Sequence, residues 1–242
     1  MNSRTRDFGL IEAAVALFVQ NNIAGWVKAA ALALAVTLPV MPVLKYTYIT
    51  FAFSLFVLIW VKLRGETWAS FGLIVPAKWG RTIGFGVLVF LAQLAYGMFA
   101  QPGVEHAVAA LTGTGPNRAP QVLGEVTGNL SLFLYLLPFV WLFAAFGEEV
   151  FYRGYLMSRF AQFMGEGRTA WTIALIAQAL LFGAAHAYQG PPGMVSAAIG
   201  GLILGAGTLI WGRTLWPAII GHGLADTLGF TLLYFGMLGA HG

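Results

Sequence analysis

The stretch LSLFLYLLPFVWLFAAFG (residues 130–147) contains no charged side chain and leads directly into EEVFYR (148–153). A helix needs about 20 consecutive apolar residues to cross a bilayer. Because the run shows no period-2 alternation of polar and apolar residues, it predicts a membrane-spanning helix and not a barrel strand. Two glutamates and an arginine then follow, where burial of an ionised side chain costs several kcal/mol.

The whole chain shares this apolar character. Of its 242 residues, 59% are hydrophobic and 9% are charged, whereas a soluble domain has about 25% charged residues. Most of its surface must therefore face lipid. We predict a single all-α membrane domain over residues 1–242, a polytopic helical bundle of about seven or eight transmembrane helices. The expected spans are 23–44, 47–62, 80–100, 130–147 with a helical continuation to about 163, 170–186, 193–211 and 215–235.

Basic residues set the expected orientation in the cytoplasmic membrane. Arg4 and Arg6 precede an interrupted apolar run, so residues 1–22 are predicted to be an N-terminal amphipathic segment on the inner side. The loop 61–81 carries four basic residues against one acid, and the loop 101–129 carries one basic residue against two acids. By the positive-inside rule, the first loop is cytoplasmic and the second is external.

The net charge of +4 is explained by the same rule and does not indicate nucleic acid as a partner. No basic cluster with interleaved aromatic residues is present. The chain also has no cysteine, which excludes disulfides, thiol catalysis and cysteine-bound metal. The aromatic residues Trp141, Phe143 and Tyr155 are expected to face lipid or to lie in an interfacial belt.

Six ionisable residues nevertheless fall within the apolar segments, and such residues indicate a functional site. They are Glu148, Glu149, Arg153, His186, His222 and Asp226.

Their spacing assigns them to distinct helix faces. On an α-helix, Glu149 and Arg153 lie four residues apart and can form an ion pair, while Glu148 points about 100° away. Glu148 therefore needs a partner from another helix. His186 ends FGAAH (182–186), and HGLAD (222–226) places a histidine and an aspartate on one face.

These side chains suit hydrolysis by an activated water. A carboxylate and a histidine that share a water can act together as its general base. A second histidine with a polar neighbour can stabilise the oxyanion that forms when water adds to an amide. No good nucleophile competes with this reading, because Ser158 and Ser196 are not near a histidine in the pattern and no G-x-S-x-G motif occurs.

Three motifs in order carry a family resemblance. EEVFYR (148–153) fits E-E-x-x-x-R, FGAAH (182–186) fits F-x-x-x-H, and HGLAD (222–226) fits H-x-x-x-N/D. Over roughly residues 60–235, the chain closely resembles the CPBP family of intramembrane glutamic endopeptidases, which includes the type II CAAX prenyl proteases and the Abi bacteriocin-processing proteins. The resemblance implies a helical membrane protease that cleaves a membrane-bound or hydrophobic peptide, prenylated or not, without a metal or other cofactor.

The resemblance also implies a role for each residue. Glu148 matches the glutamate that activates water, helped by His186. His222 and Asp226 match the oxyanion-hole pair, and Glu149 and Arg153 match supporting positions. The prenyl-protease branch usually has asparagine at the last position. Asp226 can donate to an oxyanion only when it is protonated, so it either sits protonated or orients His222.

Other interpretations of the same residues stay open. A proton-coupled transporter also uses buried ionisable chains, although no internal repeat is visible. A catalytically silent membrane scaffold could retain the ion pair and the histidines for packing alone. Two histidines and a glutamate could bind zinc, but no H-E-x-x-H motif occurs. The oligomeric state is undetermined.

One expectation conflicts with this site. Glu148 follows a span that ends on the cytoplasmic side, whereas His186 lies roughly 24 Å into its own span at about 1.5 Å per residue. Either the helix that ends at His186 starts outside the membrane, or it is strongly tilted, or the inner boundary at 147 is wrong.

Overall fold

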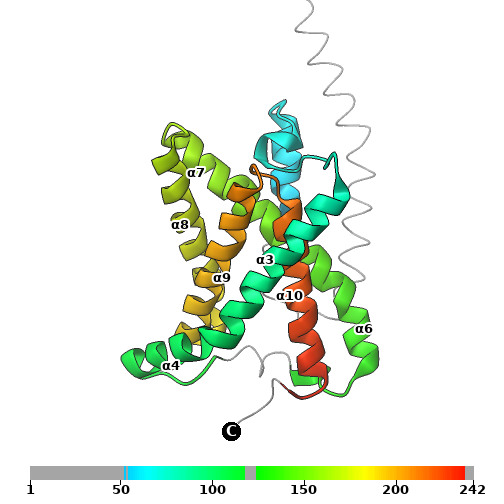
Figure 1. Cartoon of the computed structure of the whole chain (residues 1–242), viewed down its shortest axis with the longest axis vertical. Coiled ribbons are helices and arrows are strands. Elements are labelled where there is room, and N and C mark those ends of the chain that lie inside the picture. The colour runs from blue at the N-terminus through cyan, green and yellow to red at the C-terminus, as the bar shows by residue number, and fades with distance from the viewer. Residues whose placement is uncertain (1–51, 53, 118–123, 238–242) are drawn as a thin grey trace, which may run out of the picture. The chain divides into compact units, whose positions relative to one another are not determined.

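A computed structural model describes residues 52, 54–117 and 124–237 of the chain, and every element in these ranges is helical. The predicted all-α fold is therefore confirmed (Figure 1). In chain order the helices are Ser54–Leu63, η2 (Trp68–Phe71), α3 (Trp79–Phe99), α4 (Gln101–Thr112), η3 (Gly124–Val126), α6 (Leu130–Phe139), η4 (Val140–Leu156), α7 (Met157–Phe163), α8 (Arg168–Ala185), η5 (Ala187–Gln189), α9 (Gly190–Ile210) and α10 (Trp216–Tyr234).

Four helices in the described ranges are long and apolar enough to cross a membrane. They are Trp79–Phe99, Leu130–Phe163, Arg168–Ala185 and Ala187–Ile210. The predicted span 215–235 is present as α10, which is less apolar because it contains His222 and Asp226. The segments 1–22 and 23–44 lie outside the described residues, and the span 47–62 is represented there by Ser54–Leu63. The total of seven or eight spans and the single domain over 1–242 stay predictions.

The helix of the opening stretch continues well past residue 147. α6, η4 and α7 follow one another without a break from Leu130 to Phe163. Pro138 lies inside α6, where its ring removes a backbone donor. From there η4 is π-helical, with bonds that reach back five residues, as from the Met157 N–H to the Tyr152 carbonyl. π-helical turns are rare and occur frequently at functional sites.

This continuation removes the conflict over depth. The predicted helical continuation to about residue 163 is confirmed, and Glu148 lies near the middle of this long helix. α7 returns into α8 through a short turn, and the rings of Tyr152 and Phe182 meet with centroids 5.1 Å apart. Because His186 follows Phe182 by about one helical turn, it reaches the level of Glu148.

Small residues allow α9 to lie closely against α8. A Cβ atom at Gly201 would lie 3.3 Å from the Ala179 Cα, and one at Gly205 would lie 2.5 Å from the Leu175 side chain. At both glycines a larger side chain would force its neighbours to shift. Such contacts are typical of helices that associate in lipid, where backbones approach closely over small residues.

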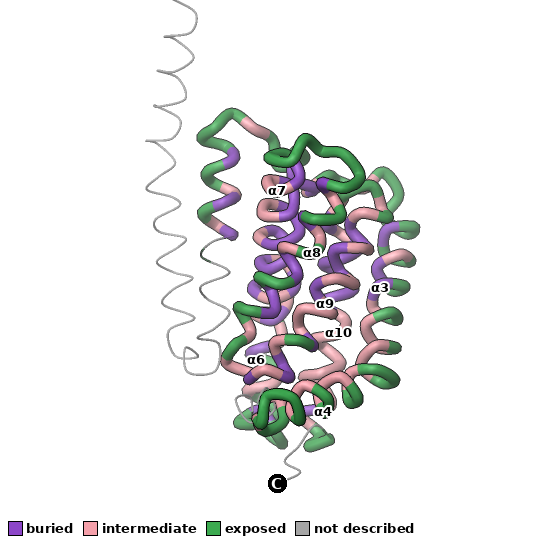
Figure 2. The backbone as a smooth tube through the Cα atoms, turned by 90° about the vertical axis from the view of Figure 1, so that its left-hand side faces the viewer, coloured by how far each residue is buried: buried purple, intermediate pink, exposed green. Residues whose placement is uncertain are grey.

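The two ends of the bundle differ in charge and in packing. Around the α7–α8 turn, Arg159 forms an ion pair with Glu66, and the Arg213 guanidinium lies 5.0 Å from the Trp171 ring. The basic loop 61–81 thus shares one end with the arginines that precede α8 and α10, as the charge pattern predicts. At the opposite end, α4 crosses the bundle and carries no buried residue (Figures 1 and 2). That the basic end faces the cytoplasm stays a prediction.

Candidate active site

The centre of the site is an ion pair within η4. The Arg153 Nη1 atom donates to the Glu149 Oε1 atom over 2.9 Å, and both side chains are 0% exposed. The spacing of four residues correctly predicts this pair. Burial of either charge alone would be strongly unfavourable, so each side chain is tolerated there because of the other.

His222 of α10 connects the pair to two further carboxylates. Its Nδ1 atom lies 2.8 Å from Glu149 Oε1, and its Nε2 atom lies 3.5 Å from Asp226 Oδ2 and 3.9 Å from Glu148 Oε2. One imidazole is therefore surrounded by three acidic side chains. The four groups come from two helices, and Glu148, Glu149 and His222 are all buried.

Two glycines bring α10 close enough for these contacts. A Cβ atom at Gly221 would lie 2.7 Å from the Val89 side chain of α3, and one at Gly223 would lie 2.5 Å from the Trp141 ring of η4. The residue between them is His222. α10 is thus held between α3 and η4, and the histidine has little freedom to move away from the glutamates.

His186 lies on a third helix, at the residue that follows α8. One of its ring nitrogens, Nδ1, forms a 2.8 Å hydrogen bond with the Phe182 carbonyl. The Phe182 ring lies 4.6 Å from the His186 ring and 6.2 Å from the His222 ring, measured between centroids. Within the described ranges, no hydrogen bond or ion pair joins His186 to Glu148. That the two share a water stays a prediction.

Two features of the structure do not follow from the sequence patterns. The contact between Glu149 and His222 was not foreseen, because α-helical spacing assigns Glu149 to Arg153 alone. Gln178 of α8 is fully buried and donates to the Gly201 carbonyl over 3.0 Å. It is a lone amide in an apolar helix, and that composition is the signal that would have identified it.

Of the aromatic residues predicted to face lipid, Phe143 is buried and Trp141 is half-buried against α10. Trp141 donates from its Nε1 atom to Thr227 Oγ1 over 3.0 Å and lies against Gly223. Phe143 is only 2% exposed. In a continuously apolar helix, the faces toward lipid and toward protein have similar residues, so the pattern alone could not separate them.

A comparison with protein families covers this part of the chain. Residues 130–228 match the family described as "Type II CAAX prenyl endopeptidase Rce1-like". The segment belongs to the CAAX protease family. All six predicted site residues lie within it, and the resemblance seen in the motifs is confirmed at the level of the family. No curated protein and no solved structure matches the chain.

The match supports a CAAX-type protease at the level of the family for residues 130–228. This is a family of CAAX-type intramembrane proteases, and the apolar helices agree with a multi-pass membrane protein.

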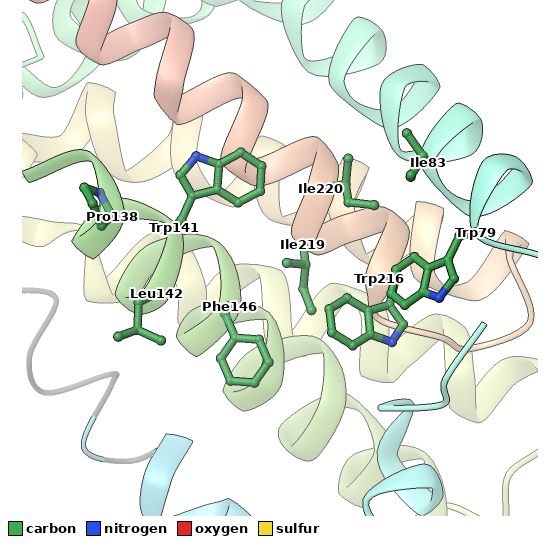
Figure 3. Close-up of a pocket in the computed structure, with 9 residues that line it drawn as sticks. All are labelled: Trp79, Ile83, Pro138, Trp141, Leu142, Phe146, Trp216, Ile219 and Ile220. Atoms are coloured by element: carbon green, nitrogen blue, oxygen red, sulfur yellow. The ribbon is translucent and has the colours of Figure 1, made fainter. Parts of the chain in front are cut away.

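An apolar groove lies between the Rce1-like segment and α3 (Figure 3). It has a volume of about 510 Å³ and is formed by α3, the α6–η4 helix and α10. Its floor includes Ile219 and Ile220, about one helical turn before Gly223. Trp141 lines the groove with one part of its ring and contacts α10 beside Asp226 with the other. The lining residues are Trp79, Ile83, Pro138, Trp141, Leu142, Phe146, Trp216, Ile219 and Ile220.

The residue types around His222, namely Glu148, Glu149 and Asp226, are also types that bind metal ions. Among the residues that the structure describes, no group of three or more histidine, aspartate or glutamate side chains is arranged to hold a metal ion. His222 is instead engaged on both ring nitrogens by carboxylates, and Glu149 is engaged by an arginine.

Proposed function

We propose that the chain is an intramembrane glutamic endopeptidase that hydrolyses a peptide bond of a membrane-associated or hydrophobic peptide. Glu148 is the general base that takes a proton from water, and His186 helps to hold that water. His222 and Asp226 act on the carbonyl side of the reaction, while Glu149 and Arg153 support them. No metal or other cofactor takes part in the proposed steps.

The observation that carries this proposal is the difference between the two adjacent glutamates. Glu149 is neutralised by the guanidinium of Arg153 at 2.9 Å, whereas Glu148 is buried with no arginine in contact among the described residues. Its closest ionisable contact is His222, at 3.9 Å. A buried carboxylate that is not neutralised by an arginine remains available to accept a proton, which is what a general base requires.

The position of His186 supports a site built from three helices. Its backbone hydrogen bond to Phe182 fixes one ring nitrogen, so the Nε2 atom is left to contact a water. The Phe182 ring fills the space between His186 and His222 and excludes bulk solvent from that side. A water held between Glu148 and His186 would then be one of few in the site. The proton that it gives up would not leak to bulk water.

The groove beside Trp141 supports an apolar substrate. Its nine lining residues are all apolar or aromatic. A hydrophobic segment that enters such a site gains about 25 cal/mol of free energy for each Å² of apolar surface that it buries. Peptide bonds next to the bound segment would lie near α10 and its histidine.

The test is cleavage of a quenched fluorescent peptide in proteoliposomes. The peptide ends in a CAAX sequence and is used with and without a prenyl group on its cysteine. We expect Glu148→Gln to abolish cleavage, because the amide cannot accept the proton, while Glu66→Gln at the basic end retains full activity. Circular dichroism and gel filtration in detergent check that both variants fold.

The outcome also separates the protease from the transporter. Wild-type cleavage rates in Glu148→Gln or in His186→Ala would exclude the proposed mechanism. A proton flux across the vesicle membrane that disappears in Glu148→Gln, with no peptide cleaved by the parent chain, would favour the carrier. Treatment with EDTA or phenanthroline is expected to leave the cleavage rate unchanged.

A further inference from the structure

His222 occupies a position in which each of its ring nitrogens faces acid oxygens. We propose that His222 is held as a positively charged imidazolium by Glu149 and Asp226, and that it is the acid that protonates the leaving amine. This inference rests on the proposed function but assigns His222 to the leaving amine in place of the carbonyl oxygen. Glu149 and Asp226 are then positioning residues that act through the histidine.

The Nδ1 side of the ring carries a proton. Nδ1 lies 2.8 Å from Glu149 Oε1, a normal hydrogen-bond distance. The same oxygen accepts from Arg153 Nη1 at 2.9 Å. An ionised carboxylate is an acceptor only, so the nitrogen must be the donor. This bond also orients the ring, and it directs Nε2 away from the ion pair.

The Nε2 side also requires a proton. Nε2 lies 3.5 Å from Asp226 Oδ2 and 3.9 Å from Glu148 Oε2. If Nε2 were unprotonated, its lone pair would point toward two acid groups in a buried site, where electrostatic repulsion is weakly screened. A proton on Nε2 replaces that repulsion with attraction to both oxygens.

The charges on all surrounding elements lead to the same state. η4 contributes Glu148, Glu149 and Arg153, and α10 contributes Asp226. From α8, the ring of Phe182 meets His222 edge to face and separates it from His186. From α3, the nearest group is the apolar Val89, which packs on the adjacent Gly221. Three carboxylates thus face one guanidinium, and an imidazolium reduces the excess negative charge.

The proposed step balances its protons. Glu148 accepts one proton from water, and the hydroxide forms a bond to the carbonyl carbon of the scissile amide. The tetrahedral intermediate then breaks its carbon–nitrogen bond, and the nitrogen takes the Nε2 proton of His222. The products are a carboxylic acid and an amine. The proton on Glu148 returns to Nε2 across the 3.9 Å gap, which restores both groups.

This assignment gives Asp226 a role as a carboxylate. An ionised aspartate cannot donate to an oxyanion, but at 3.5 Å it stabilises a positive charge on Nε2. Asp226→Asn should therefore weaken the hold on the Nε2 proton without changing the shape of the site.

The first test reads the charge of His222 directly. Nitrogen NMR of the histidine-labelled full chain in lipid nanodiscs distinguishes imidazolium from neutral imidazole, and the signal of His222 is assigned by its loss in His222→Gln. At about pH 7.5, one unit above an ordinary histidine, we expect an imidazolium in the parent chain and a shift toward the neutral form in Asp226→Asn. Glu105→Gln on α4 should leave the signal unchanged. A neutral His222 in the parent chain would overturn the inference.

The second test separates an acid from an oxyanion donor. We compare a peptide with its depsipeptide, in which an ester replaces the scissile amide, because an alkoxide leaves without prior protonation more readily than an amide nitrogen does. His222→Ala should lower amide cleavage by about 10²–10⁴-fold and ester cleavage by much less. Equal losses on both substrates would contradict the role as acid. If the parent chain cleaves neither substrate, the proposed function fails, and the NMR result still decides the charge.

Discussion

Two glutamate–arginine pairs of the same chemistry occupy opposite environments in this molecule. Arg153 and Glu149 are both fully buried in the middle of the bundle, whereas Arg159 and Glu66 are 30% and 26% exposed at its basic end. The first pair joins residues of one helix and is shared with His222. The second links the α7 helix to the loop before α3 and lies within reach of solvent.

The comparison shows how position determines what an ion pair contributes. A pair that is exposed to water contributes about 0–1 kcal/mol, because solvent and salt screen it. When one partner of a buried pair is removed, the charge that remains costs about 3–5 kcal/mol. Removing one member of the buried pair is therefore expected to destabilise the fold strongly, whereas removing the exposed pair is expected to have little effect on stability.

The largest expected effect comes from breaking the buried pair. Arg153→Met should lower the free energy of unfolding in detergent by about 3–5 kcal/mol, since Glu149 is left charged and buried. Arg159→Met is the matched control and should cost at most about 1 kcal/mol. Both are measured by reversible denaturation in mixed micelles. Similar losses in the two variants would mean that the inner pair is accessible to water.

The second effect tests the close packing at Gly223, which is next to His222 in the sequence. In Gly223→Ala the new methyl group would meet the Trp141 ring, and we expect a loss of about 1–3 kcal/mol from overpacking. Gly229→Ala on the same helix meets no atom within 4 Å and is the control. Combining Gly223→Ala with Trp141→Leu should recover part of the loss. No recovery would mean that the glycine is needed for another reason.

The third effect compares a buried glutamine with an exposed one. Gln178 is fully buried and donates to two backbone carbonyls, whereas Gln162 accepts from Arg159 at the exposed end. Gln178→Leu should cost about 1–2 kcal/mol through lost hydrogen bonds, and Gln162→Leu should be close to neutral. Thermal unfolding in the same detergent ranks the two, and a reversed order would contradict the assignment of the interior.

The smallest effect is the pH dependence of the exposed pair. The hydrogen bond from Arg159 holds the pKa of Glu66 below its ordinary value of 4.5. A lowered pKa in the folded chain contributes stability above the ordinary pKa, and this contribution is lost as the pH falls through the lowered value. In Glu66→Gln the unfolding temperature should therefore change less between neutral and acidic pH than in the parent chain. An identical pH profile would show that the pair contributes nothing.

The sequence is informative where chemistry is local and ambiguous where helices meet. The pairing of Glu149 with Arg153 follows from four-residue spacing, and the motifs that contain His186 and His222 lead to the correct family. The contact of Glu149 with His222 does not follow, because it depends on a π-helical turn and on two glycines that bring α10 into place. No local sequence pattern in η4 predicts the π-helical turn.

Uniform hydrophobicity accounts for the other differences. Trp141 and Phe143 stand in a run where nearly every residue is apolar, so neither face is marked as the interior. The charged residues that follow residue 147 lie inside the bundle, and the helix continues to Phe163 as predicted.

The polarity of α10 has a consequence for how this protein is made. The helix carries His222 and Asp226 near its middle and is not among the four described helices that are apolar enough to cross a membrane unaided. On insertion scales an aspartate at a helix centre costs about 2.5–3.5 kcal/mol. The translocon would therefore release α10 into lipid efficiently only after η4 is already there to receive its polar face. Synthesis from the N-terminus supplies η4 before α10. Membrane insertion of α10 and assembly of the site are therefore expected to occur in the same step.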